Sequence, residues 1–93
     1  MKGLSHEVRY KRAVFYVQTQ DMGHEAGYVE SLIYKGGTLV TSRKSYYYSL
    51  LGSPGLPEKV AQLLKEQHQT VIRDIEIGRF HYTLTPSEEE DGG

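Results

Sequence analysis

The sequence feature that most constrains the fold is Gly36-Gly37, which separates two runs with the composition of β-strands, residues 28–35 and 38–45. A two-residue hairpin loop needs positive φ angles, which glycine adopts without a steric penalty. The glycine pair therefore predicts a tight antiparallel hairpin. Because the turn also sets the register, it predicts three facing pairs: Tyr34 with Leu39, Ile33 with Val40, and Glu30 with Arg43.

Residues 7–20 alternate over a long stretch, which predicts one long strand. Its middle, from Ala13 to Val17, is apolar on both faces. This pattern is typical of a strand with a layer packed on each side, or of one whose second face lies in a subunit contact. Two glycines and a polar cluster within residues 21–27 predict a loop after it.

Apolar residues recur at helical spacing from Pro57 to Ile77, which predicts one long helix. Proline suits the first helical position, and Gly78 is a typical stop. Burial of the apolar stripe makes this helix the main cover of the core. The stripe consists of Val60, Leu63, Leu64, Val71, Ile72 and Ile75. A helical turn is also expected within residues 45–51.

The C-terminal part changes character at Pro86. Residues 79–85 return to alternation, with Phe80, Tyr82 and Leu84 on one side, which predicts a short fourth strand at a sheet edge. Residues 87–93 have no apolar side chain and carry four acids. We therefore expect residues 86–93 to be a disordered acidic tail.

These elements together predict a single small α+β domain over residues 1–85. It is a three- to four-stranded antiparallel meander packed by one long C-terminal helix. The chain of 93 residues has no cysteine, so its stability must come from packing or from a partner rather than from disulfides. No apolar run is long enough for a secretory signal or a membrane span, and we expect a cytoplasmic protein with no membrane contact.

Catalytic and metal-binding signatures are absent from the sequence. No nucleotide-binding glycine motif or nucleophile motif occurs, and no two of the four histidines have the spacing of metal ligands. We therefore expect no enzyme activity, no catalytic residue, no metal and no cofactor. His68 differs from the other histidines because it lies inside the apolar stripe of the predicted helix. It is either packed at a core or subunit boundary, or it acts as a pH-sensitive or ligand-facing switch.

The remaining evidence favours a small protein-interaction domain. A strand that is apolar on both faces and a helix that covers only one of them leave a sheet face or edge for a partner. A second copy is the simplest partner, so we expect a homodimer with closed twofold symmetry. The candidate contact residues are Val14, Phe15, Tyr16, Val17 and Tyr82.

The alternative is a weak single-stranded nucleic-acid-binding module, since cations alternate with tyrosines in two segments. The candidates are Arg9, Lys11, Arg12, Arg43, Lys44, Tyr46, Tyr47 and Tyr48. The formal net charge of −1 argues against it.

Overall fold

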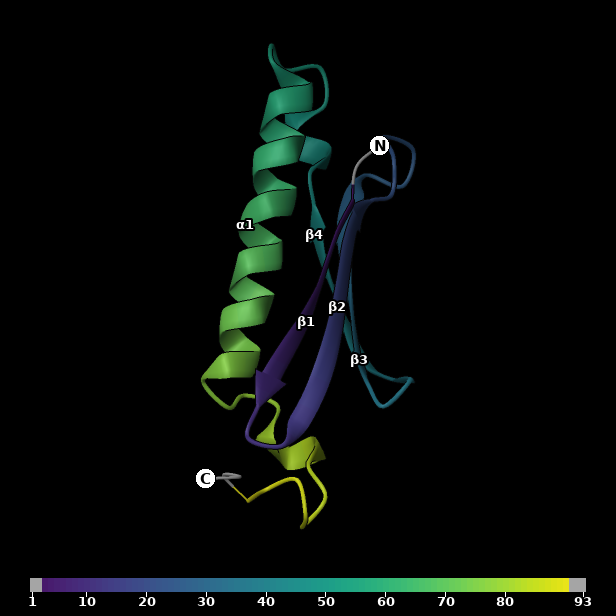
Figure 1. The fold of residues 1–93 in the computed structure, drawn as a ribbon. Helices are drawn as coiled ribbons and strands as arrows, with labels where there is room; N and C mark the ends of the chain where they lie inside the picture. Colours follow the sequence, from purple (N-terminus) through teal and green to yellow (C-terminus); the bar gives the residue numbers. More distant parts are fainter. Residues whose placement is uncertain (1–2, 91–93) are drawn as a thin grey trace.

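The computed structural model describes residues 3–90 and consists of an antiparallel sheet packed on one face by a long helix (Figure 1). The strands are β1 (Gly3–Tyr10), β2 (Ala13–Asp21), β3 (Tyr28–Lys35) and β4 (Thr38–Tyr46), in the order β1-β2-β3-β4. A short 3-10 turn, η1 (Tyr48–Leu50), precedes helix α1 (Leu56–Glu76), and η2 (His81–Thr83) follows it. The expected α+β class with one long C-terminal helix is confirmed.

The single long strand expected over residues 7–20 is wrong, because the chain reverses at Lys11-Arg12. Lys11 has a φ of 54°, the one positive φ among the non-glycine residues of 3–90. Val8 consequently lies opposite Phe15, and both are buried on the face that α1 covers. In one continuous strand, Val8 and Phe15 would point to opposite faces, but the two-residue turn places them on the same face of the sheet. A lysine at positive φ gives no sequence signal comparable to glycine or asparagine.

The hairpin at Gly36-Gly37 is confirmed, with φ angles of 60° and 81°. Tyr34 faces Leu39 as expected. The other two expected pairs are wrong, because an irregularity between Ile33 and Tyr34 shifts the register by one residue on β4. The observed pairs are Ile33 with Thr41 and Glu30 with Lys44. The shift turns Arg43 toward the helix, where it forms an ion pair of 2.9 Å with Asp74.

Helix α1 lies within one residue of its expected bounds, with Pro57 in the first turn and Gly78 at a φ of 88° just after the end. Its 21 residues give a length of about 32 Å, which matches the long strands that it covers. It buries Val60, Leu64, Val71 and Ile75 as expected. Within residues 3–90, no helix combines the length and the apolar composition needed to cross a membrane.

The short fourth strand expected over residues 79–85 is wrong. These residues form turns and η2, with local backbone hydrogen bonds from Thr83 to Phe80 and from Leu84 to His81. Phe80 and Leu84 flank η2 as its cap residues, and both side chains are buried. The remaining alternate residue, Tyr82, is 74% exposed.

The core under α1 consists of two apolar clusters, one at each end of the sheet. The first contains Val8, Ala13, Phe15, Val17, Ile33, Val71, Ile75, Phe80 and Leu84. The second contains Val29, Tyr47, Val60 and Leu64. The buried polar residues are Thr19, Ser31, Gln67 and His68. On β2 and β3 the polar pair Thr19–Ser31 stands between Val17–Ile33 and Asp21–Val29, so a polar layer separates the two clusters.

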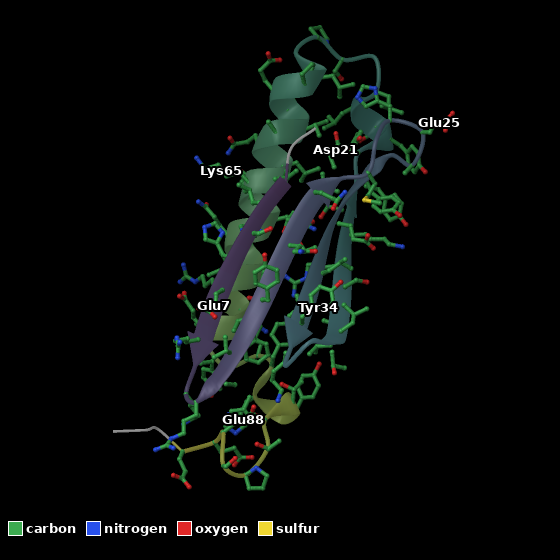
Figure 2. All side chains as sticks on the ribbon, turned by 45° about the vertical axis from the view of Figure 1, so that its right-hand side comes forward. Glu7, Asp21, Glu25, Tyr34, Lys65 and Glu88 are labelled. Carbon is green, nitrogen blue, oxygen red and sulfur yellow. The ribbon has the colours of Figure 1, made fainter. Side chains whose placement is uncertain are left out.

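The acidic segment expected to be disordered is described as far as Glu90, whereas residues 91–93 lie outside the described part. Residues 86–90 form turns below the β1–β2 turn, where Figure 2 shows Glu88. Lys35 Nζ lies 2.7 Å from Glu88 Oε1, and the Arg12 amide donates to the Glu88 carbonyl at 3.1 Å.

Candidate functional site

A chain of hydrogen bonds runs through the polar layer between the sheet and α1. At the β1 edge, His6 Nδ1 lies 2.7 Å from His68 Nε2. The other nitrogen of His68, Nδ1, lies 2.7 Å from Thr19 Oγ1. Thr19 Oγ1 in turn lies 2.6 Å from Ser31 Oγ. The chain therefore links β1, α1, β2 and β3.

Gln67 extends this chain of hydrogen bonds to β4 and determines which group donates and which accepts in each of them. Its amide nitrogen donates to Ser31 Oγ at 3.0 Å and to the Arg43 carbonyl at 3.1 Å, and its amide oxygen accepts from the Ser45 hydroxyl. Because both amide hydrogens are used, Ser31 accepts from Gln67 and keeps its own hydrogen for Thr19 Oγ1. The reverse direction would leave the Ser31 hydroxyl hydrogen without an acceptor among the hydrogen bonds of residues 3–90.

The tautomers of the two histidines follow from this direction. Thr19 receives its hydrogen bond from Ser31, so its own hydroxyl donates to His68 Nδ1. His68 therefore carries its proton on Nε2 and donates it to His6 Nδ1. The His6 proton is then on Nε2, which is the atom of the pair that a ligand can reach, since His68 is only 1% exposed.

Burial lowers the pKa of His68, and the neighbouring His6 lowers it further. A charged His68 would lose hydration in the interior and would repel a charged His6. His68 is therefore neutral at pH 7, in agreement with the single-proton ring that the hydrogen bonds require. A switch role for His68 stays a prediction.

Beside the histidine pair lies a groove of about 800 Å³ between the edge of β1 and helix α1, along which it extends from Pro57 to Ile72. Its apolar lining comes from Leu4, Pro57, Val60, Ala61, Leu64 and Ile72. Its polar lining includes His6, His24, Asp21, Lys65, His68 and Gln69. Figure 2 shows Lys65 projecting from α1 beyond the edge of β1, and Asp21 at the end of β2. We call this feature the β1–α1 groove.

Asp21, the one carboxylate among the described residues lining the β1–α1 groove, is already engaged. It accepts hydrogen bonds from the Tyr47 hydroxyl at 2.7 Å and from the Gly23 amide at 2.9 Å. Burial, together with this hydrogen bond and the charge of Asp21, raises the pKa of Tyr47 to about 12. Lys65 has no ion pair with any residue of 3–90, and its ammonium group is therefore available to a ligand.

The spacing of the histidines gives no indication that His6 pairs with His68, 62 positions away. The sequence does contain a pattern that relates the two histidines. His6 shares its alternate positions with Val8, and His68 lies within the helical stripe, so both point into the space between sheet and helix. The signal becomes readable only once the chain reversal at Lys11-Arg12 is known, because that reversal puts Val8 on the core face.

The opposite face of the sheet is uncovered within residues 3–90: α1 lies along one side, and no other element lies along the other (Figure 1). Strand alternation and register place on it the apolar side chains of Val14, Tyr16, Leu32, Tyr34 and Leu39. The charged side chains on the same face are Glu7, Arg9, Glu30 and Lys44. We call this surface the open face.

The structure separates the expected interaction residues. Val14 and Tyr16 lie on the open face, and Tyr16 is 43% exposed. Phe15 and Val17 are fully buried under α1, so their assignment to a contact surface is wrong. Tyr82 is exposed but belongs to η2, beside Phe80, rather than to a strand.

The expected basic residues do not converge on one surface. Arg9 and Lys44 lie on the open face, but on the two opposite edge strands. Lys11 and Arg12 form the β1–β2 turn, and the Arg12 guanidinium lies 3.9 Å from Glu90. Arg43 is turned to the helix side by the register shift and is paired with Asp74.

The tyrosines expected to stack on bases differ in their exposure. Tyr47 is 1% exposed, so it cannot stack on a base. Tyr46 and Tyr48 are exposed and stack on each other, with ring centroids 5.7 Å apart. Lys44 Nζ lies 4.9 Å from the centre of the Tyr28 ring, beside Tyr46.

The chain has no match among protein-family models, and neither the curated proteins nor the solved structures searched contain a match to it.

Proposed function

We propose that this protein is a small interaction domain that forms a homodimer through the open face. The observation that carries the proposal is the apolar row on this face, in which Tyr16 faces Tyr34 and Tyr34 faces Leu39. Of these, Tyr16 is 43% and Leu39 is 50% exposed. A contiguous apolar patch on a sheet face is typical of a contact surface. A cytoplasmic location is part of this proposal, because a chain without cysteine suits a reducing compartment.

The area of the open face is adequate for a second copy. Strands of about eight residues at about 3.3 Å each, spaced about 4.8 Å apart, give four strands a face of about 500 Å². Two such faces would remove about 1,000 Å² from water, which is the lower bound for a specific interface. A dimer of this size would be weak and would depend on concentration.

The charges of the open face favour a second copy over a nucleic acid. Its strand residues carry two acids, Glu7 and Glu30, and two bases, Arg9 and Lys44. A balanced face does not repel an identical face, whereas a surface that binds phosphates needs an excess of cations. In the dimer the twofold axis lies between the two sheets, so that the helices form the outer layers.

Sedimentation equilibrium tests the proposal at micromolar concentrations. We expect a dimer mass for the unmodified chain and a folded monomer for Tyr16→Asp, because the variant places a charge in the contact. Tyr82→Asp is the matched control: it changes an exposed tyrosine away from the open face and should leave the dimer intact. Phe15→Asp should unfold the domain. A monomer mass for the unmodified chain across the accessible concentrations would overturn the proposal.

A weak single-stranded nucleic-acid binder is the second candidate, and Lys44 with the half-buried ring of Tyr28 and the exposed rings of Tyr46 and Tyr48 favours it. Binding to an oligonucleotide at low salt should then fall with salt on a log–log plot, with a slope of about −0.7 per neutralised phosphate. Lys44→Gln should reduce that slope, whereas Lys59→Gln on α1 should not. Binding that is absent, or indifferent to salt, would rule this candidate out.

A further inference from the structure

We propose that the β1–α1 groove binds a small amphipathic carboxylic acid, with its aliphatic body along α1 and its carboxylate between Lys65 and His6. The site lies on the helix side of the sheet, away from the open face. It is therefore independent of the proposed dimer.

The shape and lining of the groove select the body of the ligand. From Pro57 to Ile72 the lining follows α1 for about 22 Å, which suits a linear aliphatic chain better than a compact ring. The aliphatic lining residues, Leu4, Val60 and Leu64 among them, offer no hydrogen bonds to the body of a ligand. A volume of about 800 Å³ lies within the usual range of small-molecule sites.

The polar groups of the groove select the head group. Lys65 precedes His68 by three residues on α1, so the two side chains are neighbours on the same face of the helix. His68 holds His6 through a hydrogen bond of 2.7 Å, which brings His6 to the same part of the groove. Lys65 offers a charge without an ion pair in residues 3–90, and His6 offers the Nε2 hydrogen. Two donors, one of them positively charged, fit a carboxylate.

Asp21 does not oppose this assignment. Its Oδ1 already accepts from the Tyr47 hydroxyl and from the Gly23 amide, and these hydrogen bonds disperse its charge at the far end of β2. His24, which packs edge-on against Tyr47, is the other polar group at that end. An ammonium group would need a carboxylate beside Lys65, and the described lining residues offer only the neutral amide of Gln69 there.

The hydrogen-bond chain behind the histidines explains why the donor is held in place. His6 Nδ1 is fixed as an acceptor because His68, Thr19, Ser31 and Gln67 all donate in one direction. If His6 carried its proton on Nδ1 and a lone pair on Nε2, the hydrogen bonds from His6 through His68 and Thr19 to Ser31 would all have to run in the opposite direction. The chain therefore keeps the N–H of His6 available to an anionic group.

Decanoate and decan-1-ol, below the concentrations at which they aggregate, are suitable probes because they differ only in the head group. Titration followed by amide chemical shifts should show that decanoate moves residues of the β1–α1 groove and binds at least ten-fold more tightly than decan-1-ol. Lys65→Met should weaken decanoate about ten-fold and leave decan-1-ol unchanged. Lys59→Met is the matched control, since Lys59 is exposed on α1 but does not line the groove.

Each other outcome overturns the proposal. Equal affinity for decanoate and decan-1-ol would show that the groove does not recognise the carboxylate. Amide shift changes confined to the open face, or no shift changes at millimolar decanoate, would show that decanoate does not bind in the β1–α1 groove. The Tyr16→Asp variant should bind decanoate as the unmodified chain does, so the result does not depend on whether the dimer forms.

Discussion

At the scale of single residues, the distinctive feature is Thr19, a threonine buried near the C-terminal end of β2. Its hydroxyl connects the helix to the sheet, through His68 on one side and Ser31 on the other. A buried polar group is tolerated when it is hydrogen-bonded and is costly when it is not. None of the buried side-chain nitrogen and oxygen atoms of the described residues lacks a partner, so the polar layer is fully satisfied.

Thr19→Val keeps the shape of the side chain and removes the hydroxyl. His68 Nδ1 would lose its donor, and Ser31 would lose its acceptor, at a cost of about 1–3 kcal/mol for each unsatisfied group. We expect the free energy of unfolding to fall by about 2–4 kcal/mol in urea denaturation. Thr41→Val, whose hydroxyl makes only an exposed hydrogen bond of 3.4 Å, should change it by less than about 0.5 kcal/mol. Equal effects of the two variants would contradict the role of the chain.

His68 predicts a pH dependence of stability. Its pKa is lowered by burial and by His6, so near and below the ordinary value of 6.5 the unfolded chain binds more protons there than the folded one. The contribution of neutral His68 to stability is therefore complete above about pH 6.5 and is lost as the pH falls below that value. Urea midpoints between pH 7.5 and 5.5 should decline for the unmodified chain and should decline less for His68→Leu. His24→Gln, at an exposed histidine, should keep the original slope.

At the scale of elements, the β1–β2 turn is where chain conformation and residue type disagree. Lys11 adopts a φ of 54°, in a region that costs most residues other than glycine about 1–2 kcal/mol. The turn nevertheless forms, because the antiparallel pairing of β1 with β2 and the burial of Val8 and Phe15 compensate for it.

Lys11→Gly should therefore raise the free energy of unfolding by about 0.5–1 kcal/mol, since it relieves the steric conflict at positive φ. Loss of the contact between Lys11 Nζ and the Tyr10 ring, at 5.8 Å, offsets only a part of this gain at an exposed site. Arg12→Gly is the control: it places glycine at the neighbouring turn position, where φ is not positive, and should be neutral or destabilising. Thermal unfolding of the two variants decides between these outcomes.

At the scale of the whole molecule, the chain forms a body of 50 × 20 × 18 Å whose lower end is closed by its own C-terminal segment. The hydrogen bond from Lys35 is the main cause of a lowered pKa of the Glu88 carboxyl, and the hydrogen bond from the Thr85 backbone amide lowers this pKa further. Its contribution to stability is present above the ordinary pKa of a glutamate and is lost as the pH falls through the lowered value.

Removal of residues 86–93 should leave thermal stability nearly unchanged at neutral pH, because the only apolar side chain among them, Pro86, is exposed and only one of the ion pairs, Lys35–Glu88, is partly buried. The amide shifts that change should include Arg12 and Lys35, the partners of Glu88. The truncated chain should also bind anionic ligands more tightly at low salt, since these cations are then unpaired. Shift changes confined to the neighbours of Thr85 would show that the segment makes no such contact in solution.

The sequence by itself determined the features that depend on a few neighbouring residues. Glycine at two successive positions allows the positive φ angles of the β3–β4 turn, and the apolar spacing from Val60 to Ile75 is a property of one helix. These signals were sufficient for the α+β class, the C-terminal helix and the uncovered sheet face. They also placed Tyr16 among the candidates for a contact, although its membership of a dimer interface stays a prediction.

Only the tertiary structure decided where distant residues meet. The reversal at Lys11, the register shift that turns Arg43 to Asp74, and the pairing of His6 with His68 each depend on which strands and helix face one another. A one-residue shift moves a strand side chain to the other face, so local polarity cannot determine such pairs. The β1–α1 groove was invisible for the same reason: its two sides come from opposite ends of the chain, and only their packing brings them together.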